Sequence, residues 1–309
     1  MTGEGLNSSI AFPFVPFRGG KVDLRAHHKN VTYLTRNCFL DGARKRVIAT
    51  GGSTLLHHLT AEEQLEVARV TGEAAGEGAW IISGILPTPT ATAAWQVREQ
   101  SRLARRPDAF LILPVVGGCN PEGVRRELQR FCDSLGDEVD CDFIVYMRDS
   151  ALRAAYCRLV CESKRIIGIK IGTSVDDVKP VCDAVAGAGA VMWGIGDLST
   201  AAARAGAHGH TSGTALMCLR ASDEINNAQR RADYAAALRI EGDLRELEEI
   251  RFMSGRAYNY SVMVEVLKMS GFTDVDPGDG GPFNAPPPAD ILARLPALVD
   301  RLRRYHAAA

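Results

Sequence analysis

The segment 143–171 holds two apolar runs, Phe143-Ile144-Val145-Tyr146-Met147 and Ile166-Ile167-Gly168-Ile169-Lys170-Ile171, with a stretch of mixed polarity between them. Short, continuous apolar runs are typical of strands that are buried on both faces of a parallel sheet. Parallel neighbours need a crossover connection, which is usually a helix. The segment therefore predicts a strand–helix–strand unit of an α/β protein.

The same alternation extends along most of the chain. Eight β-rich apolar runs are present, at residues 10–15, 46–50, 80–85, 110–116, 143–147, 166–171, 191–195 and 208–212. Helix-like patterns lie between them, for example at residues 60–74, 91–104, 120–135 and 174–186. Eight such units predict a (β/α)8 TIM barrel. The alternative is a doubly wound open sheet, which needs a glycine-rich phosphate turn after its first strand; this chain has Pro16-Phe17-Arg18-Gly19-Gly20 there.

The strand pattern stops at about residue 221. Residues 223–247, 251–270 and 291–306 are predicted helices, and the Gly-, Pro- and Asp-rich segment 272–290 is a predicted connector. We therefore expect a barrel domain that carries the active site over residues 1–220. A C-terminal helical region, residues 221–309, is expected to pack on the barrel.

Composition and charge exclude several functional classes. The chain has 36 Lys and Arg against 37 Asp and Glu, whereas nucleic-acid-binding proteins usually carry a basic excess, so no nucleic-acid partner is expected. The longest apolar runs, such as 109–117, are too short to cross a bilayer, and residues 1–10 lack the features of a secretory signal. We expect a cytoplasmic protein without membrane association.

Three pairs of side chains have the chemistry of metal ligands: Cys157 and Cys161, His57 and His58, and His208 and His210. The eight cysteines lack the spacing of a disulfide framework, and reduced, packed thiols are the favoured interpretation. No carboxylate stands at the spacing of a familiar metal motif around the histidines. We predict neither a metal nor an organic cofactor.

Lys170 is the leading candidate for chemistry. In (β/α)8 barrels the active site lies at the carboxyl ends of the strands, and Lys170 lies near the end of the run 166–171. It is the one lysine of seven that is embedded in an apolar strand. Burial disfavours the ammonium form, and a neutral amine can attack a carbonyl to form a Schiff base. The alternative is a packed lysine whose ammonium pairs with a carboxylate.

Three further features are expected near Lys170. Tyr146 ends the preceding strand, so its phenol is placed to relay protons, or it is a packing tyrosine with a satisfied hydroxyl. The turn Thr50-Gly51-Gly52-Ser53-Thr54 can converge amide and hydroxyl donors on a carboxylate, or it is a plain βα turn. The small, polar segment 206–213 is expected to border the same mouth.

These motifs resemble those of the dihydrodipicolinate synthase / N-acetylneuraminate lyase family, the pyruvate-type class I aldolases. The similarity covers residues 10–219. Val15-Pro16-Phe17 is similar to the family's T-P-F. The family then has G-T-T-G-E, a leucine and an acidic pair, and at this place the chain has Gly51–Leu59 followed by Thr60-Ala61-Glu62-Glu63. Val145-Tyr146 lies where the family has Y-N, and Ile166–Lys170 matches its I-x-G-I-K motif. Gly196-Asp197 together with residues 206–212 resembles the family's G-D … G-x-x-G-x-x-S stretch.

The resemblance implies a fold, a reaction and a site. Lys170 would form a Schiff base with a 2-oxo acid, such as pyruvate or a keto-deoxy sugar acid, and Tyr146 would shuttle protons. Gly52 and Ser53 would take the places of the paired threonines that hold the keto acid carboxylate. We expect Thr54, Thr211 and Ser212 to bind substrate at the same site. The resemblance further implies a lyase without a cofactor that forms a homodimer or homotetramer.

Several positions depart from the synthase branch. Gly52 lacks the hydroxyl of the family's first threonine, and Leu55 replaces its glutamate. The segment Pro114-Val115-Val116-Gly117-Gly118 lacks the tyrosine that completes a proton relay across a subunit interface. Met147-Arg148-Asp149 after Tyr146 is closer to the Y-N-R-D stretch of 5-dehydro-4-deoxyglucarate dehydratases. Arg148 would there clamp a distal carboxylate, or it is a surface arginine paired with Asp149.

We therefore predict a divergent member of this family that is not an authentic dihydrodipicolinate synthase. Aldol cleavage, condensation and dehydration all remain open. A second hypothesis is a catalytically weakened paralogue that binds or senses a 2-oxo acid. A third is a metal-dependent aldolase that uses the histidine pairs.

Overall fold

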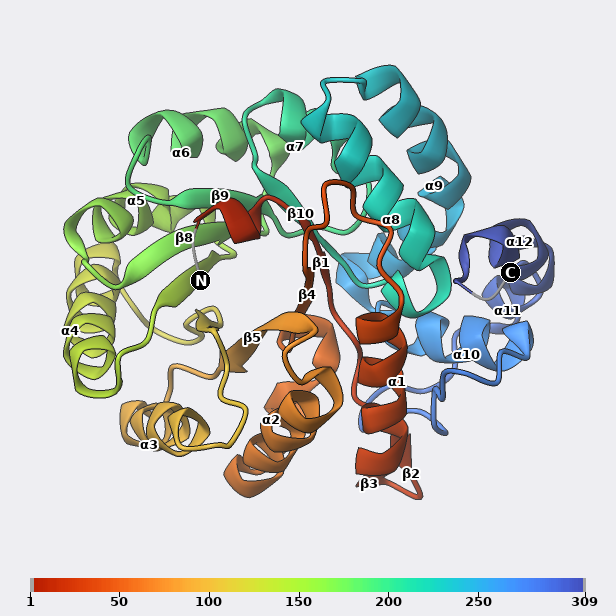
Figure 1. Ribbon diagram of the computed structural model, residues 1–309, viewed down its shortest axis with the longest axis horizontal. Helices are drawn as coiled ribbons and strands as arrows, with labels where there is room; N and C mark the ends of the chain where they lie inside the picture. The colour runs from red at the N-terminus through yellow and green to blue at the C-terminus, as the bar shows by residue number, and fades with distance from the viewer. Residues whose placement is uncertain (1–2, 308–309) are drawn as a thin grey trace.

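Eight parallel strands close into a barrel in the computed structural model, which describes residues 3–307 (Figure 1). Each strand pairs with its neighbour in the chain, and the first closes the ring against the last. The barrel strands are β1 (Ser9–Ala11), β4 (Arg46–Ala49), β5 (Ala79–Ile85), β6 (Ala109–Ile112), β7 (Phe143–Met147), β8 (Ile166–Ile171), β9 (Ala190–Trp193) and β10 (Gly209–Ser212). The predicted (β/α)8 TIM barrel is confirmed.

A ring of helices covers the outside of the barrel (Figure 1). In chain order they are α1 (Leu24–Arg36), α2 (Ala61–Ala75), α3 (Thr90–Ser101), α4 (Pro121–Val139), α5 (Arg153–Glu162), α6 (Val178–Ala184), α7 (Thr200–Arg204) and α8 (Ala215–Arg230). Side-chain caps start several of them. Thr60 accepts from the Glu63 N–H at 3.2 Å and the Glu63 carboxylate accepts from the Thr60 N–H at 2.9 Å, a capping box that begins α2.

Short elements fill the connections. A two-stranded hairpin, β2 (Phe17–Arg18) and β3 (Lys21–Val22), separates β1 from α1. Single turns of 3-10 helix occur at Gly3–Leu6, Gly52–Thr54, Leu56–His58, Ser150–Leu152, Val175–Asp177 and Arg303–Tyr305.

Some predicted strands are too long at their carboxyl ends. β1 ends at Ala11 rather than at residue 15, and β6 ends at Ile112 rather than at 116. The residues beyond β1 are apolar because they are buried under the C-terminal helices, with the ring of Phe14 5.3 Å from that of Tyr260. The apolar run at residues 10–15 therefore indicates burial, and only its first residues pair in the sheet.

The C-terminal helices also differ from the prediction. The predicted helix 223–247 is the end of α8 and most of α9 (Tyr234–Arg256), with a turn between them where Asp233 caps α9. The predicted helix 251–270 is broken after Phe252 and resumes as α10 (Ser261–Ser270). The predicted helix 291–306 is α11 (Ala289–Leu292) and α12 (Leu295–Leu302), since Pro296 starts a new helix.

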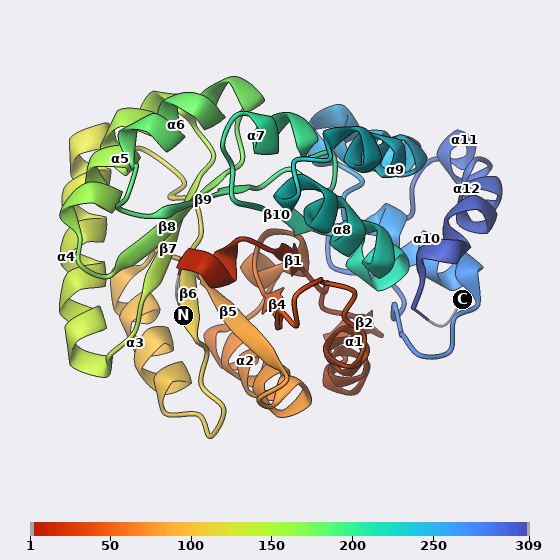
Figure 2. The same ribbon diagram turned by 45° about the horizontal axis from the view of Figure 1, so that its top comes forward.

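The C-terminal helices lie against one side of the barrel, beside α8 and α1 and away from α3 to α5 (Figure 2). Leu247, Val266 and Leu298 share one apolar core with Val47 and Ile48 of β4. α8 crosses the predicted domain boundary at residue 220, and the buried Asp223 on it pairs with Arg46 of β4 at 2.5 Å. The barrel and the helical region are therefore packed together through a continuous interior.

Between residues 3 and 307, no helix is both long enough and apolar enough to span a membrane. The eight cysteines are all free thiols.

Candidate active site

Lys170 projects into the mouth of the barrel from β8. Ile169 and Ile171 on the same strand face the outer helices, so the alternate residue Lys170 faces inward. Its side chain is 5% exposed, and Nζ lies 4.2 Å from the ring centroids of both Phe12 and Tyr146. A Cβ on Gly194, at the end of β9, would stand 2.8 Å from Lys170 Cε, so glycine leaves room for the lysine.

Burial lowers the pKa of Lys170 below its ordinary value; the neighbouring Tyr146 opposes this shift, and the positive charges of Arg256 and Arg148 add to it. No ion pair between Lys170 and a carboxylate is present among residues 3–307, so the alternative of a packed, paired ammonium is not what this structure contains. This environment shifts the equilibrium toward the neutral amine, which is the nucleophilic form.

Tyr146 lies beside Lys170 because β7 and β8 pair in register, with Tyr146 opposite Lys170. Burial raises the pKa of the phenol, but the charges of Lys170, Arg148 and Arg256 outweigh this effect and lower its pKa overall. A phenol of lowered pKa next to an amine of lowered pKa is a pair that can exchange a proton.

The turn after β4 contributes two residues to the cavity. Gly51 and Gly52 have φ of 141° and 48°, which lie in the region that favours glycine, and Gly52 and Ser53 line the mouth. Thr54 is buried and turned away, because its hydroxyl accepts from the Gly51 N–H at 2.6 Å and donates to the Gly51 carbonyl at 3.0 Å. Thr54 therefore holds the turn, and Gly52 and Ser53 face the cavity.

The last strand divides its polar side chains between the cavity and the interior. Thr211 lines the cavity. Ser212 is fully buried, donates to Asp197 at 2.9 Å and contacts Ser222 at 2.7 Å, so it supports the barrel wall from behind. Gly206, Ala207 and His208 precede β10 and lie at its amino end, contrary to the prediction that the whole segment 206–213 borders the mouth.

The C-terminal region supplies a large part of the cavity that the sequence did not predict. Five of its residues line the mouth with Lys170: Arg251, Phe252, Gly255, Arg256 and Asn259. The only sequence signal was Ser254-Gly255, which interrupts an otherwise helical pattern. Arg251 is buried and fixed by Glu248 at 2.8 Å and by Asn259 at 2.6 Å.

Arg148 stands where two cavities meet. The cavity around Lys170 has a volume of about 280 Å³, and a neighbour of about 330 Å³ shares Gly52, His57, Tyr146 and Arg148 with it. The second cavity extends over Pro114–Val116 of the loop after β6. Asp149 accepts from the Ala151 N–H at 2.9 Å, and the described residues contain no ion pair between Asp149 and Arg148. Arg148 is therefore free to face a ligand.

The histidine pairs do not form a cluster. His57 lines the mouth and His58 packs on Phe283, with ring centroids 5.3 Å apart. His208 accepts from the Val191 N–H at 3.1 Å near the amino ends of the strands, and buried His210 lies 3.3 Å from Asp197. Within residues 3–307, no three His, Cys, Asp or Glu side chains gather in a way that could hold a metal ion.

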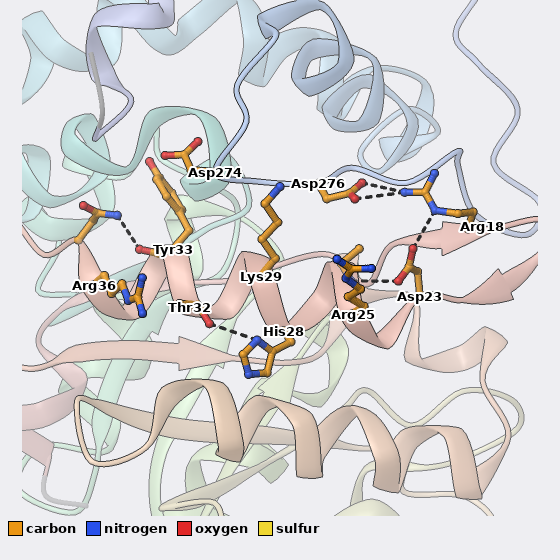
Figure 3. Close-up of a pocket in the computed structure, with 12 residues that line it drawn as sticks. Arg18, Asp23, Arg25, His28, Lys29, Thr32, Tyr33, Arg36, Asp274 and Asp276 are labelled. Atoms are coloured by element: carbon orange, nitrogen blue, oxygen red, sulfur yellow. Dashed lines mark hydrogen bonds and ion pairs between the residues drawn. The ribbon is translucent and has the colours of Figure 1, made fainter.

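A larger hollow, of about 870 Å³, lies on the outer face of α1 (Figure 3). Arg25, Lys29 and Arg36 line it, and Asp274 and Asp276 face them from the segment after α10. Its acidic residues are already engaged, since Asp276 pairs with Arg18 and Asp274 with His306. This hollow is open, lined by exposed cations and remote from Lys170, so the candidate chemistry belongs to the barrel mouth.

The fold and the site together define a (β/α)8 barrel with a buried, deprotonation-prone lysine at the carboxyl ends of its strands. A model of the dihydrodipicolinate synthetase family matches residues 5–277. The chain therefore belongs to the dihydrodipicolinate synthetase family, which is a family of lyases.

Solved structures agree with this assignment at the level of the fold. Dihydrodipicolinate synthase from Bacillus clausii is 22% identical, with a TM-score of 0.84 and 97% of each chain covered. The chloride-inhibited synthase from Acinetobacter baumannii, solved with pyruvate, is 22% identical, with a TM-score of 0.81 over 96% of this chain and 99% of that chain. CdNal from Clostridium difficile, in complex with mannosamine, is 15% identical, with a TM-score of 0.78 over 96% and 98%. No curated protein sequence gives a significant match.

Proposed function

We propose that this protein is a Schiff-base-forming lyase, an aldolase or dehydratase, that acts on a 2-oxo acid such as pyruvate or a keto-deoxy sugar acid. The observation that carries the proposal is the burial of the Lys170 amine between Phe12 and Tyr146, with its pKa lowered. Membership of a family of lyases supports the same reaction class.

In the proposed reaction, the neutral Lys170 amine adds to the ketone carbon of the substrate. The carbinolamine loses water to give an imine, and the protonated imine accepts the electron pair of a neighbouring C–C or C–H bond. Tyr146 moves the protons that these steps require. Gly52, Ser53 and Thr211 line the part of the mouth in which the carboxylate next to the ketone would be bound, while Thr54 and Ser212 support it from behind.

A catalytically weakened paralogue is the second candidate. The loop 114–118 lacks the interface tyrosine. Its residues Pro114–Val116 line the second cavity, and Val116 is 70% exposed. Such a protein would form the imine but would not release a product.

We also propose that the protein is a cytoplasmic homodimer or homotetramer. Sedimentation measures the oligomeric state; a monomeric dihydrodipicolinate synthase variant is among the similar structures.

The test is intact mass after borohydride reduction in the presence of pyruvate. We expect the wild type to gain one reduced pyruvate on Lys170, and Lys170→Ala to gain none. Lys164→Ala, which removes an exposed lysine six residues away, is the matched control and should be labelled like the wild type. Labelling of Lys170→Ala, or no labelling of the wild type by pyruvate or longer 2-oxo acids, would refute the Schiff-base mechanism. Labelling without turnover of any aldehyde or sugar acid would favour the weakened paralogue.

A further inference from the structure

The cavity around Lys170 has an unbalanced charge. Of the described residues that line it, four are cationic, Arg148, Lys170, Arg251 and Arg256, and none is Asp or Glu. Arg251 is paired with Glu248, which lies behind it, at 2.8 Å. Among the described residues, no ion pair joins Arg148, Arg256 or Lys170 to a carboxylate. Arg148 and Arg256 are therefore two guanidinium groups without a carboxylate partner, more than one substrate carboxylate at the turn after β4 would account for.

Arg256 reaches the cavity because α9 breaks in front of it. Met253 leaves the helix with ψ of 157°, and Ser254, Gly255 and Arg256 have φ of 50°, 70° and 76°. Two of these left-handed residues are not glycine, and such conformations cost free energy that the surrounding structure must supply. Strained backbone of this kind is concentrated at ligand-binding sites. There it can direct a side chain toward the site that would face another direction in a continuous helix.

Gly172, just beyond β8, brings the two arginines together. The Arg256 guanidinium donates to the Gly172 carbonyl at 3.0 Å. A Cβ on Gly172 would stand 2.8 Å from both Arg148 Cδ and Tyr146 Oη, so these side chains lie directly over it. This bond uses one N–H group of Arg256, and a guanidinium has five N–H groups that can donate hydrogen bonds. Burial lowers the pKa of Arg256; the neighbouring Tyr146 opposes this shift and the positive charge of Arg148 adds to it, a cost that a bound anion would reduce.

We infer that Arg256 is a specificity-determining residue which, together with Arg148, binds a second anionic group at the far end of the substrate. The inference rests on the proposed function, because it places this group on the same molecule that condenses with Lys170. The substrate is accordingly a 2-oxo acid with two anionic groups. Guanidinium groups suit a carboxylate in particular, because their planar fork donates two parallel hydrogen bonds.

The test compares three 2-oxo acids as borohydride-trapped adducts: pyruvate, 2-oxoglutarate, and 2-oxoglutarate methylated on its distal carboxylate. We expect the wild type to reach half-maximal trapping at a concentration at least about tenfold lower for 2-oxoglutarate than for the ester, the ratio that about 1.4 kcal/mol produces. Arg256→Gln should raise the value for 2-oxoglutarate about tenfold relative to the values for pyruvate and the ester, so that the preference for 2-oxoglutarate over its ester falls about tenfold. Arg245→Gln, an exposed arginine on the same helix, is the charge-matched control.

Failure of the inference is separable from failure of the Schiff-base proposal. Calorimetric binding of 2-oxoglutarate to Lys170→Ala and to the double variant with Arg256→Gln reports the second anion without any imine. Equal affinities in these two variants, or a wild type that traps pyruvate but does not prefer 2-oxoglutarate to its ester, would overturn the role of Arg256. Loss of affinity on Arg256→Gln without any imine trapping would retain the anion site and refute only the chemistry.

Discussion

The two regions that meet at the cavity are built in opposite ways. Lys170 and Tyr146 lie on paired strands, where the β7–β8 register fixes one directly beside the other. Arg251 and Arg256 flank a break in α9, where three consecutive residues have positive φ. The proposed chemistry therefore depends on paired strands, whereas the proposed binding of a second anionic group depends on a segment whose conformation is held by tertiary contacts.

The largest expected effect is on the turnover rate, and it comes from a change in the pair of strands β7 and β8. Tyr146→Phe should lower the turnover rate by about 10²–10⁴-fold, because it removes the proton-transferring hydroxyl while the ring still packs on Lys170. Single-turnover kinetics with trapping measures imine formation and the later steps separately, and both should be slowed. A variant with unchanged rates would mean that Tyr146 only packs and that the proton relay lies elsewhere.

An intermediate effect is expected where the broken helix meets the barrel. A Cβ on Gly213 would stand 2.1 Å from Arg251 Nη2, so Gly213→Ala must displace the buried arginine. We expect a loss of about 1–3 kcal/mol of unfolding free energy from this overpacking, and weaker binding of 2-oxo acids.

Gly242→Ala is the matched control for Gly213→Ala. A Cβ there has no neighbour within 4 Å, and the position is inside α9, so the change should stabilise the protein by about 0.5–1 kcal/mol. Urea denaturation measures both variants. Equal stability of the two alanine variants would contradict the close contact between β10 and Arg251.

The smallest effect is a change in pH dependence. Only the neutral Lys170 amine attacks, so imine formation should rise with pH through a pKa that lies below the ordinary lysine value. Arg148→Gln removes a positive charge that disfavours the ammonium form, so the pKa of Lys170 should increase and the rising limb should move to higher pH. Trapping rates with pyruvate across a pH series measure this shift, with Arg245→Gln as control. A shift to lower pH would reverse the assigned sign of the interaction.

The barrel and the lysine were predictable for a local reason. Apolar runs such as 143–147 and 166–171 alternate with helical patterns, and a lone lysine inside an apolar run is conspicuous without any knowledge of its neighbours. The break in α9 was not predictable in the same way, because Ser254 and Arg256 adopt left-handed conformations that their own side chains do not favour.

The sequence by itself determined the strand–helix alternation, the barrel and the place of Lys170 and Tyr146 on neighbouring strands, because these follow from short-range periodicity. Only the tertiary structure decided which polar groups face the cavity. In it, the hydroxyls of Thr54 and Ser212 form hydrogen bonds within the protein instead of facing the cavity. Arg251 and Arg256 of the C-terminal region line the mouth of the barrel. The physical reason is that side-chain direction at a turn or a broken helix is set by long-range packing, such as the Arg256 bond to Gly172 across 84 residues, which no local pattern encodes.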